Sequence, residues 1–461
     1  MQSLVAIAWL TWKAAFRFRL FLVIAVLLLV SVIGLPVLIK DDGTARGFTQ
    51  ILLTYTLTVI TGLLGLSTLW LACGTLARDI EECQIQVVAV KPVGRWQIWL
   101  GKWMGLVSLN AVLLALSGAS VYGLLQWRAT RLPAEEQRTL RNEVLVARGS
   151  VKPPEFSREI ETKTDQELQE RLKQNPTATA DLREVRRQIR EQVKTRYQLV
   201  PPSSVRQWDI DLGLLKDALR DQPLRLRIKF YAANGSPSGT FIGYWQVGMP
   251  GKTRFKQFEP MSLAPDTFHE FEIPPNLYDA SGVLTISFAN PNNTALLFPL
   301  EDGMELLYRE GGFGLNFARG LGIIFCWMAL LAAVGLTGAS FLSFPVAAFF
   351  SLGLLAMTFS RGTLASVVSE GTIMNYSPET GVQGHSALDF AFVPLFRAEL
   401  EIINLAGDFS PIDSLSSGRS IPWRELAAAF LQIVLLLGGI VGLIGIFIFN
   451  RRELATAQGN Q

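Results

Sequence analysis

Residues 20–39 read LFLVIAVLLLVSVIGLPVLI and carry no charged side chain between Arg19 and Lys40. A helix needs about 20 apolar residues to cross a bilayer whose hydrocarbon core is roughly 30 Å thick, so this stretch predicts a membrane span. It exceeds the ~7–15 apolar residues of a cleaved signal peptide, and further apolar stretches follow it. The sequence therefore predicts a multi-pass membrane protein.

Other uncharged windows place the remaining spans. Three of them each fit one helix, centred on residues 51–71, 106–125 and 431–449. Ahead of the first span, Trp9 and Trp12 precede Lys13 in an apolar segment, a composition typical of a helix in the headgroup plane. An N-terminal extension of the first span is the alternative for this segment.

The window between Arg319 and Arg361 holds 41 uncharged residues. One helix of that length would measure about 60 Å, twice the apolar thickness of a bilayer. Gly335, Gly338 and Pro345 offer a break within the window, so it predicts two spans joined by a very short turn. The expected total is six transmembrane helices.

Lysine and arginine residues near the span ends favour cytoplasmic termini. With the N-terminus inside, nine lie in cytoplasmic segments and five or six in short outer segments. Residues 1–126 then hold the interfacial helix, spans one to three and a cytoplasmic loop at 78–102. Residues 315–461 hold spans four to six, an outer loop at 361–424 and the cytoplasmic C-terminus.

Residues 127–314 form a polar insert, which carries 51 of the 81 charged residues of the chain. Opposite charges three and four apart predict solvated helices within 131–200. Within 205–312, from Leu224 onward, apolar residues recur with a period of two, and Gly, Pro and Asn turns separate the segments, which predicts a small antiparallel β-sandwich. We expect a mainly α membrane protein with this extracytoplasmic α+β insert.

Three aromatic residues of the insert suit a ligand platform, for instance for a sugar: Trp208, Tyr244 and Trp245. Aromatic residues in strands more often belong to a core. Three cysteines, none of them in the insert, exclude a disulfide framework.

The loop at 78–102 begins with acidic residues, and Ile80, Cys83, Val87 and Val90 then fall near helical spacing on one face. Pro92 and Gly94 end that helix. The pattern predicts a short surface helix with one apolar face and a charged start. An ordinary positively charged cytoplasmic loop is the simpler interpretation.

This loop resembles that of the permease subunits of ABC-2 type ABC transporters. The motifs that carry the resemblance are Glu81/Glu82, Lys91-Pro-Val-Gly-Arg95 and Gly101-Lys102. The N-terminal helix before Arg17 and Arg19 and the end Phe449-Asn-Arg-Arg-Glu453 are also similar to that family. Cys83-Gln84 replaces a Gly-Thr pair that the family often has, and the large insert is a second departure.

The resemblance implies that the loop is a coupling helix, which fits a groove on a separate ATPase subunit. The docking residues would be Glu81, Glu82, Gln86, Lys91 and Arg95. It further implies two ATPase copies holding ATP and Mg, a second permease copy or a homologue, and the cytoplasmic membrane of a prokaryote. The expected function is ATP-driven export.

No catalytic motif accompanies these spans. The nearest match to a phosphate loop, Gly248-Met-Pro-Gly-Lys-Thr253, has Gln246 where the first glycine should stand. His269 and His385 are the two histidines and neither has a metal-binding spacing, so we expect no enzyme activity and no cofactor. The net charge of +3 is too small to suggest a nucleic-acid binder, so we expect no nucleic-acid partner. The alternative function is a non-transporting membrane anchor whose outer β-domain binds a ligand or partner.

Overall fold

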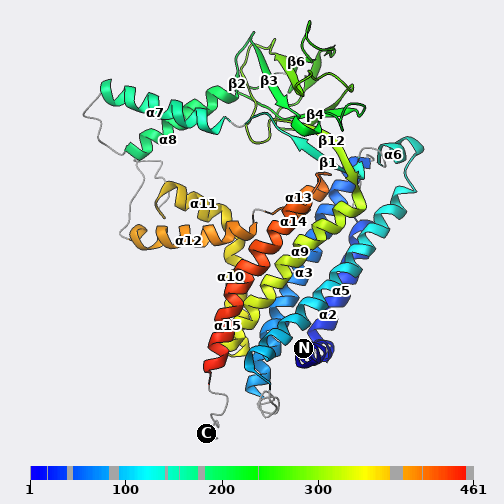
Figure 1. Cartoon of the computed structure of the whole chain (residues 1–461), viewed down its shortest axis with the longest axis vertical. Helices are drawn as coiled ribbons and strands as arrows, with labels where there is room; N and C mark the ends of the chain where they lie inside the picture. Colours follow the sequence, from blue (N-terminus) through cyan, green and yellow to red (C-terminus); the bar gives the residue numbers. More distant parts are fainter. Residues whose placement is uncertain are drawn as a thin grey trace. The chain divides into compact units, whose positions relative to one another are not determined.

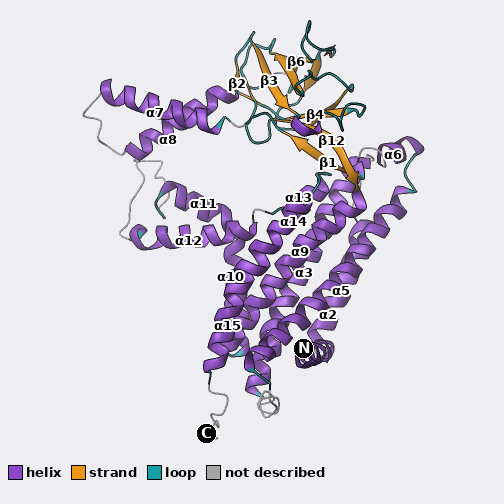
Figure 2. Cartoon of the chain, viewed as in Figure 1, coloured by secondary structure: helices purple, strands orange, loops and turns teal. Residues whose placement is uncertain are grey.

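The computed structural model describes residues 2–17, 19–38, 45–82, 93–140, 144–154, 156–174, 182–236, 238–373, 388–407 and 409–452. The chain divides into two compact units. The helical unit comprises residues 1–147 and 311–461, and the strand-rich unit comprises residues 148–310. Figure 2 shows the strands gathered in the second unit.

The first half of the helical unit contains α1 (Gln2–Arg17), α2 (Arg19–Leu38), α3 (Ala45–Glu81), α5 (Arg95–Ala129) and α6 (Ala134–Thr139). Its second half contains α9 (Phe313–Phe341), α10 (Phe344–Phe359), α11 (Arg361–Glu370), α12 (Asp389–Gly407), α13 (Pro411–Ser416), α14 (Trp423–Ala429), a π-helical turn (Phe430–Gly438) and α15 (Gly439–Arg451). In Figure 1, α3, α5, α9 and α15 run side by side.

Four of the described helices are long and apolar enough to cross a membrane: 47–81, 95–129, 313–341 and 423–451. A fifth candidate is the pair α10 and α11, which is bent by 61°. These helices indicate a multi-pass membrane protein, but the six expected spans are not confirmed. The first expected span coincides with the 20-residue helix α2.

The predicted break in the long uncharged window is confirmed. Helix α9 ends at Phe341, and α10 begins at Phe344 after two residues. Pro345 lies in the first turn of α10. Backbone N–H groups in the first turn have no acceptor within the helix, so a proline there costs no hydrogen bond. The bend at Ser360, between α10 and α11, coincides with the predicted start of the outer loop at residue 361, but the helical structure of α11 there was not predicted.

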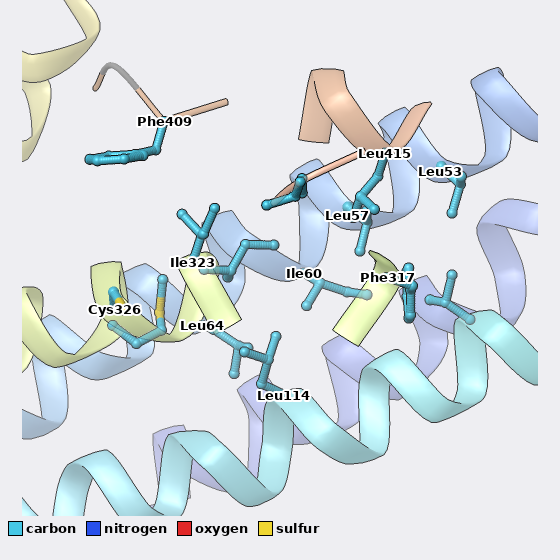
Figure 3. Packing of buried hydrophobic residues seen from close by; sticks show 14 of the residues in the cluster. Leu53, Leu57, Ile60, Leu64, Leu114, Phe317, Ile323, Cys326, Phe409 and Leu415 are labelled. Carbon is cyan, nitrogen blue, oxygen red and sulfur yellow. The ribbon is translucent and has the colours of Figure 1, made fainter. Parts of the chain in front are cut away.

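The main core of the helical unit lies between α3, α5 and α9. Figure 3 shows Leu53, Leu57, Ile60 and Leu64 of α3, which are four, three and four residues apart and therefore share one face. Small residues bring α3 close to α9: a Cβ atom added at Gly335 would lie 2.6 Å from Cβ of Ala72. Such close backbone approach replaces the hydrophobic driving force that is missing between helices in lipid.

The strand-rich unit contains two larger sheets and one small sheet. The first has the order β1-β12-β4-β9, the second β3-β10-β6-β7 with β8 on β6, and the third β2-β11-β5. The longer strands are β1 (Val146–Val151), β3 (Val205–Asp211), β4 (Leu224–Ile228), β6 (Phe241–Val247), β9 (His269–Ile273), β10 (Val283–Ala289) and β12 (Met304–Gly312). The short ones are β2 (Leu199–Val200), β5 (Tyr231–Ala232), β7 (Lys256–Gln257), β8 (Met261–Leu263) and β11 (Leu296–Leu297).

The period of two correctly located the strand at Leu224. Leu224, Leu226 and Ile228 are buried in a core to which both larger sheets contribute. Arg225 lies opposite Glu272 of β9, 3.4 Å away, on the other face of the strand. Strand β3 opens the region that was expected to be β-rich. Strand β1 was not expected, because it falls inside the segment expected to be helical.

Two charged helices of the strand-rich unit form an antiparallel pair, α7 (Ser157–Gln174) and α8 (Leu182–Gln198). Ile160, Ile189 and Val193 are buried between them. Arg186 bridges from α8 to Glu161 and Asp165 of α7 at 3.1 and 2.9 Å. The compact unit begins at Arg148, rather than at residue 127, because α5 continues to Ala129 and α6 belongs to the helical unit.

Candidate functional site

One end of the helical unit carries a polar network where α3 ends and α5 begins. The ammonium group of Lys102 donates to Oδ2 of Asp79 at 2.6 Å and to the carbonyl oxygen of Thr75 at 2.8 Å. The side chain of Lys102 is only 8% exposed. A buried ammonium group is costly without partners, so Lys102 of α5 must keep its bonds to Asp79 and Thr75 of α3. The pair therefore connects α3 and α5 directly.

Two arginines bind the carboxyl ends of other helices at the same end of the unit. Nη1 of Arg95 donates to the carbonyls of Phe449, Asn450 and Arg452 at 3.3, 2.8 and 2.8 Å, where α15 ends. Nη1 of Arg452 donates to the carbonyl of Ser340 in the last turn of α9, at 3.0 Å. Both cations meet carbonyl groups without intrahelical partners at the negative ends of helix dipoles.

Glu81 connects the end of α3 to the start of α10. Its Oε1 accepts a hydrogen bond from the backbone N–H of Phe344 at 2.9 Å. A carboxylate there is favoured by the positive end of the α10 dipole. The guanidinium of Arg78 lies 4.7 Å from the ring centroid of Phe344, which adds a cation–π contact.

Helix α1 packs tightly on α5 beside this network. A Cβ atom added at Gly101 would lie 2.7 Å from Cβ of Ile7, and one at Gly105 would lie 2.7 Å from Cβ of Thr11. Glycines four residues apart on one face permit this close helix crossing. Trp12 Nε1 also donates to Ser108 Oγ at 2.9 Å.

We call Asp79, Glu81, Arg95, Lys102 and Arg452 the helix-end network. It joins the ends of α3, α5, α9, α10 and α15 through side chains. Because packed helices move as rigid bodies, a displacement of the segment between α3 and α5 would reach all five helices.

The sequence-predicted docking residues lie in part at this site. Glu81 and Glu82 are exposed at the end of α3, and Arg95 begins α5. Gln86 and Lys91 lie outside the described residues. Sequence reasoning missed the Asp79–Lys102 pair and Arg452, although opposite charges at the ends of two consecutive apolar helices are a signal for pairing.

The proposed outer platform is divided between two faces of the second sheet. Trp208 and Trp245 are 7% and 1% exposed, and both pack on Phe298 at centroid distances of 5.3 and 5.9 Å. Tyr244 is 41% exposed, because neighbouring residues of a strand point to opposite faces. The three side chains therefore do not share one surface.

Trp208 lines a cleft of about 470 Å³ in the strand-rich unit. The cleft lies between the α7–α8 pair and the sheets, and its charged lining residues are Lys152, Arg190, Glu191, Lys194 and Glu301. Lys194 donates to Oε1 of Glu301 at 2.8 Å. This hydrogen bond is the main reason why the pKa of Glu301 lies below its ordinary value of 4.5.

This bond predicts a pH-dependent stability. A carboxyl group whose pKa falls on folding stabilises the fold above its unfolded pKa, and the stabilisation is lost as the pH falls through the folded pKa. We expect Lys194→Met to melt below wild type at pH 7 and the difference to shrink below about pH 4. Lys173→Met, on α7, is the control that should not differ. Melting of the full chain from pH 7 to pH 3 measures this, and a difference that persists at pH 3 would contradict the assignment.

Among the described residues, no group of three or more His, Cys, Asp or Glu side chains is placed to hold a metal ion. No family model, curated protein or solved structure matches the chain. The resemblance to ABC-2 permeases therefore depends on the motifs in the sequence itself.

Proposed function

We propose that this chain is the transmembrane permease subunit of an ATP-driven exporter of the ABC-2 type. A separate ATPase subunit, in two copies, would hold ATP and Mg and hydrolyse the nucleotide. The permease would act as a pair, with a second copy of itself or with a homologue. The cytoplasmic membrane of a prokaryote is the proposed location, with both termini inside and the polar insert outside.

The helix-end network is the observation that most supports this proposal. A coupling element must pass a movement of its loop to the membrane helices, and flexible connections would dissipate that movement. Residues 83–92 lie between two helices whose ends are held by the Asp79–Lys102 pair. Arg95 extends the connection to α15, and Glu81 extends it to α10.

In the proposed mechanism, closure of the ATPase subunits moves the two coupling segments. The Asp79–Lys102 pair makes α3 and α5 move together, and the backbone bonds of Arg95 and Glu81 carry α15 and α10 with them. A path between two permeases then opens through rigid-body movement of their helices.

The rival function is a membrane-anchored binding protein. The observation that favours it is the cleft beside Trp208, whose volume of about 470 Å³ suits a small ligand. A protein of this kind needs no ATPase partner. ATP hydrolysis by the complex purified from native membranes therefore separates the two functions.

Docking is tested by removing the two acidic charges while keeping the hydrogen bond to α10. In the variant Glu81→Gln/Glu82→Gln, the amide oxygen at position 81 can still accept from Phe344 N–H. We expect about five- to tenfold less ATPase to co-purify with the tagged chain, since exposed charge pairs contribute about 0.2–1 kcal/mol each. ATP hydrolysis per permease should fall in parallel.

The matched control is Asp41→Asn/Asp42→Asn, which removes two acidic charges from the loop between the first two expected spans. It should retain wild-type hydrolysis. Absence of ATP hydrolysis in the wild-type preparation would favour the rival function. Equal hydrolysis by wild type and the Glu81/Glu82 variant would refute the docking assignment.

A further inference from the structure

Arg319 is a buried cation near the start of α9. It is 7% exposed, although it lies within a helix that is apolar enough to cross a membrane. Its neighbours Gly320 and Gly322 face Leu415, Ile421 and Leu426, so this part of α9 packs on α13 and α14. Burial of a guanidinium group without an anion is costly, and such residues in membrane helices mark functional sites.

Arg319 has no carboxylate partner among the described residues. Its Nε atom is buried and makes no hydrogen bond there. Its guanidinium carbon lies 5.6 Å from the ring centroid of Trp423, which is a cation–π contact. Within the described part of the chain, the cation is therefore held against an aromatic side chain and no anion compensates its charge.

A second unpartnered polar group lies in the segment between α13 and α14, which Asn316 holds against α9. Oγ of Ser420 is buried without a hydrogen-bond partner in the described chain. Asn316, one turn before Arg319 on the same face of α9, holds this segment by donating to Arg419 O at 2.8 Å and accepting from Ile421 N at 2.7 Å. Two buried polar atoms without partners in the described chain thus lie near one ordered connection between α9 and the segment that precedes α14.

The position of Arg319 along α9 indicates which kind of anion could bind it in a membrane. Helix α9 has 29 residues and measures about 43 Å, which exceeds a hydrocarbon core of roughly 30 Å by some 6 Å at each end. Arg319 lies six residues after Phe313, about 9 Å along the helix, which is near the boundary between hydrocarbon and headgroups when α9 is centred on the bilayer. Trp423 is 61% exposed, as suits a tryptophan at that boundary.

We propose that Arg319 binds the phosphate group of an anionic phospholipid, with Trp423 covering one side of the guanidinium group. Phosphodiester oxygens are the anions that a bilayer offers at this depth. A guanidinium group binds two phosphate oxygens at once through parallel N–H donors, which compensates both the charge and the unpaired Nε. The buried hydroxyl of Ser420, in the segment that Asn316 holds against α9, is the candidate for a further donor.

Binding is measured by native mass spectrometry of the full chain in a neutral detergent, titrated with dioctanoyl-phosphatidylglycerol. We expect Arg319→Gln to weaken the affinity by about tenfold or more. Arg319→Lys keeps the charge but loses the two-pronged donor, and we expect about threefold weaker binding. The lysine variant also decides the result if the glutamine variant does not fold.

Two further arms identify the ligand. Dioctanoylglycerol, which lacks the phosphate, should not compete, and millimolar inorganic phosphate should not displace the lipid. Displacement by inorganic phosphate at equal affinity would keep the phosphate site but assign it to a soluble ligand. The control Arg131→Gln removes an exposed arginine that lies 4.0 Å from the ring of Trp127, and it should bind as wild type. Unchanged binding in both Arg319 variants, or equal loss in the control, would overturn the proposal.

Discussion

Lys102→Met is expected to destabilise the chain by about 2–4 kcal/mol. Removal of the ammonium group leaves the carboxylate of Asp79 and the carbonyl of Thr75 without the bonds that they make at 2.6 and 2.8 Å. This loss is smaller than the full cost of breaking a buried pair, because the Asp79 side chain is 35% exposed and recovers some hydration. Thermal melting of the full chain in detergent measures the loss.

Two controls separate the ion pair from loss of the lysine side chain. The double variant Asp79→Asn/Lys102→Met leaves no unpaired charge and should recover part of the stability. Lys13→Met removes an exposed lysine of α1 and should melt as wild type. If Lys102→Met melts as wild type, the pair does not hold α3 to α5.

Gly105→Ala is expected to separate α1 from α5. The added Cβ atom would lie 2.7 Å from Cβ of Thr11, 2.9 Å from the carbonyl oxygen of Ala8 and 3.1 Å from Cα of Ala8. Two of these atoms belong to the α1 backbone, so no side-chain rotation relieves the clash. Overpacking of this kind costs about 1–3 kcal/mol. Faster hydrogen exchange of α1 amides, together with a lower melting temperature, is the expected result.

Gly123→Ala is the matched control on the same helix. Nothing lies within 4 Å of a Cβ atom added there. Alanine is the better helix former by up to about 1 kcal/mol, so this variant should be as stable as wild type or more stable. Equal protection of α1 in both variants would show that the contact at Gly105 does not hold α1 in place.

Several features could be predicted from the sequence because they depend on local composition. Uncharged windows located the helices that end near Leu38, Ala129 and Arg451, since a charge within a span is costly. Of the three residues that offered a break in the long window, Pro345 is the one near the observed boundary, since proline removes a hydrogen bond that only the first turn of a helix can spare. These signals act over one turn or one span.

The functional site could be predicted only in part. Acidic residues at the start of the loop drew attention to Glu81, but its acceptor role toward Phe344 joins positions 263 residues apart. Arg95 and the end of α15 are more than 350 residues apart. A periodic pattern within one short stretch of sequence cannot predict contacts between residues that are so far apart in the chain. The same limit explains why the predicted ligand platform is wrong. Trp208 and Tyr244 are both aromatic, but Trp208 faces the core and Tyr244 does not.

The sequence by itself determined where the chain is apolar enough to cross a bilayer, where the polar insert interrupts it, and that the second part of this insert is rich in strands. Each of these depends on hydrogen bonding and solvation within one segment. Only the tertiary structure decided that Lys102 is paired with Asp79, that Gly105 admits α1, and that Arg319 is buried without a carboxylate among the described residues. Those facts depend on which faces of distant helices meet, and charge placement acquires its energetic meaning only when packing has removed water from around it.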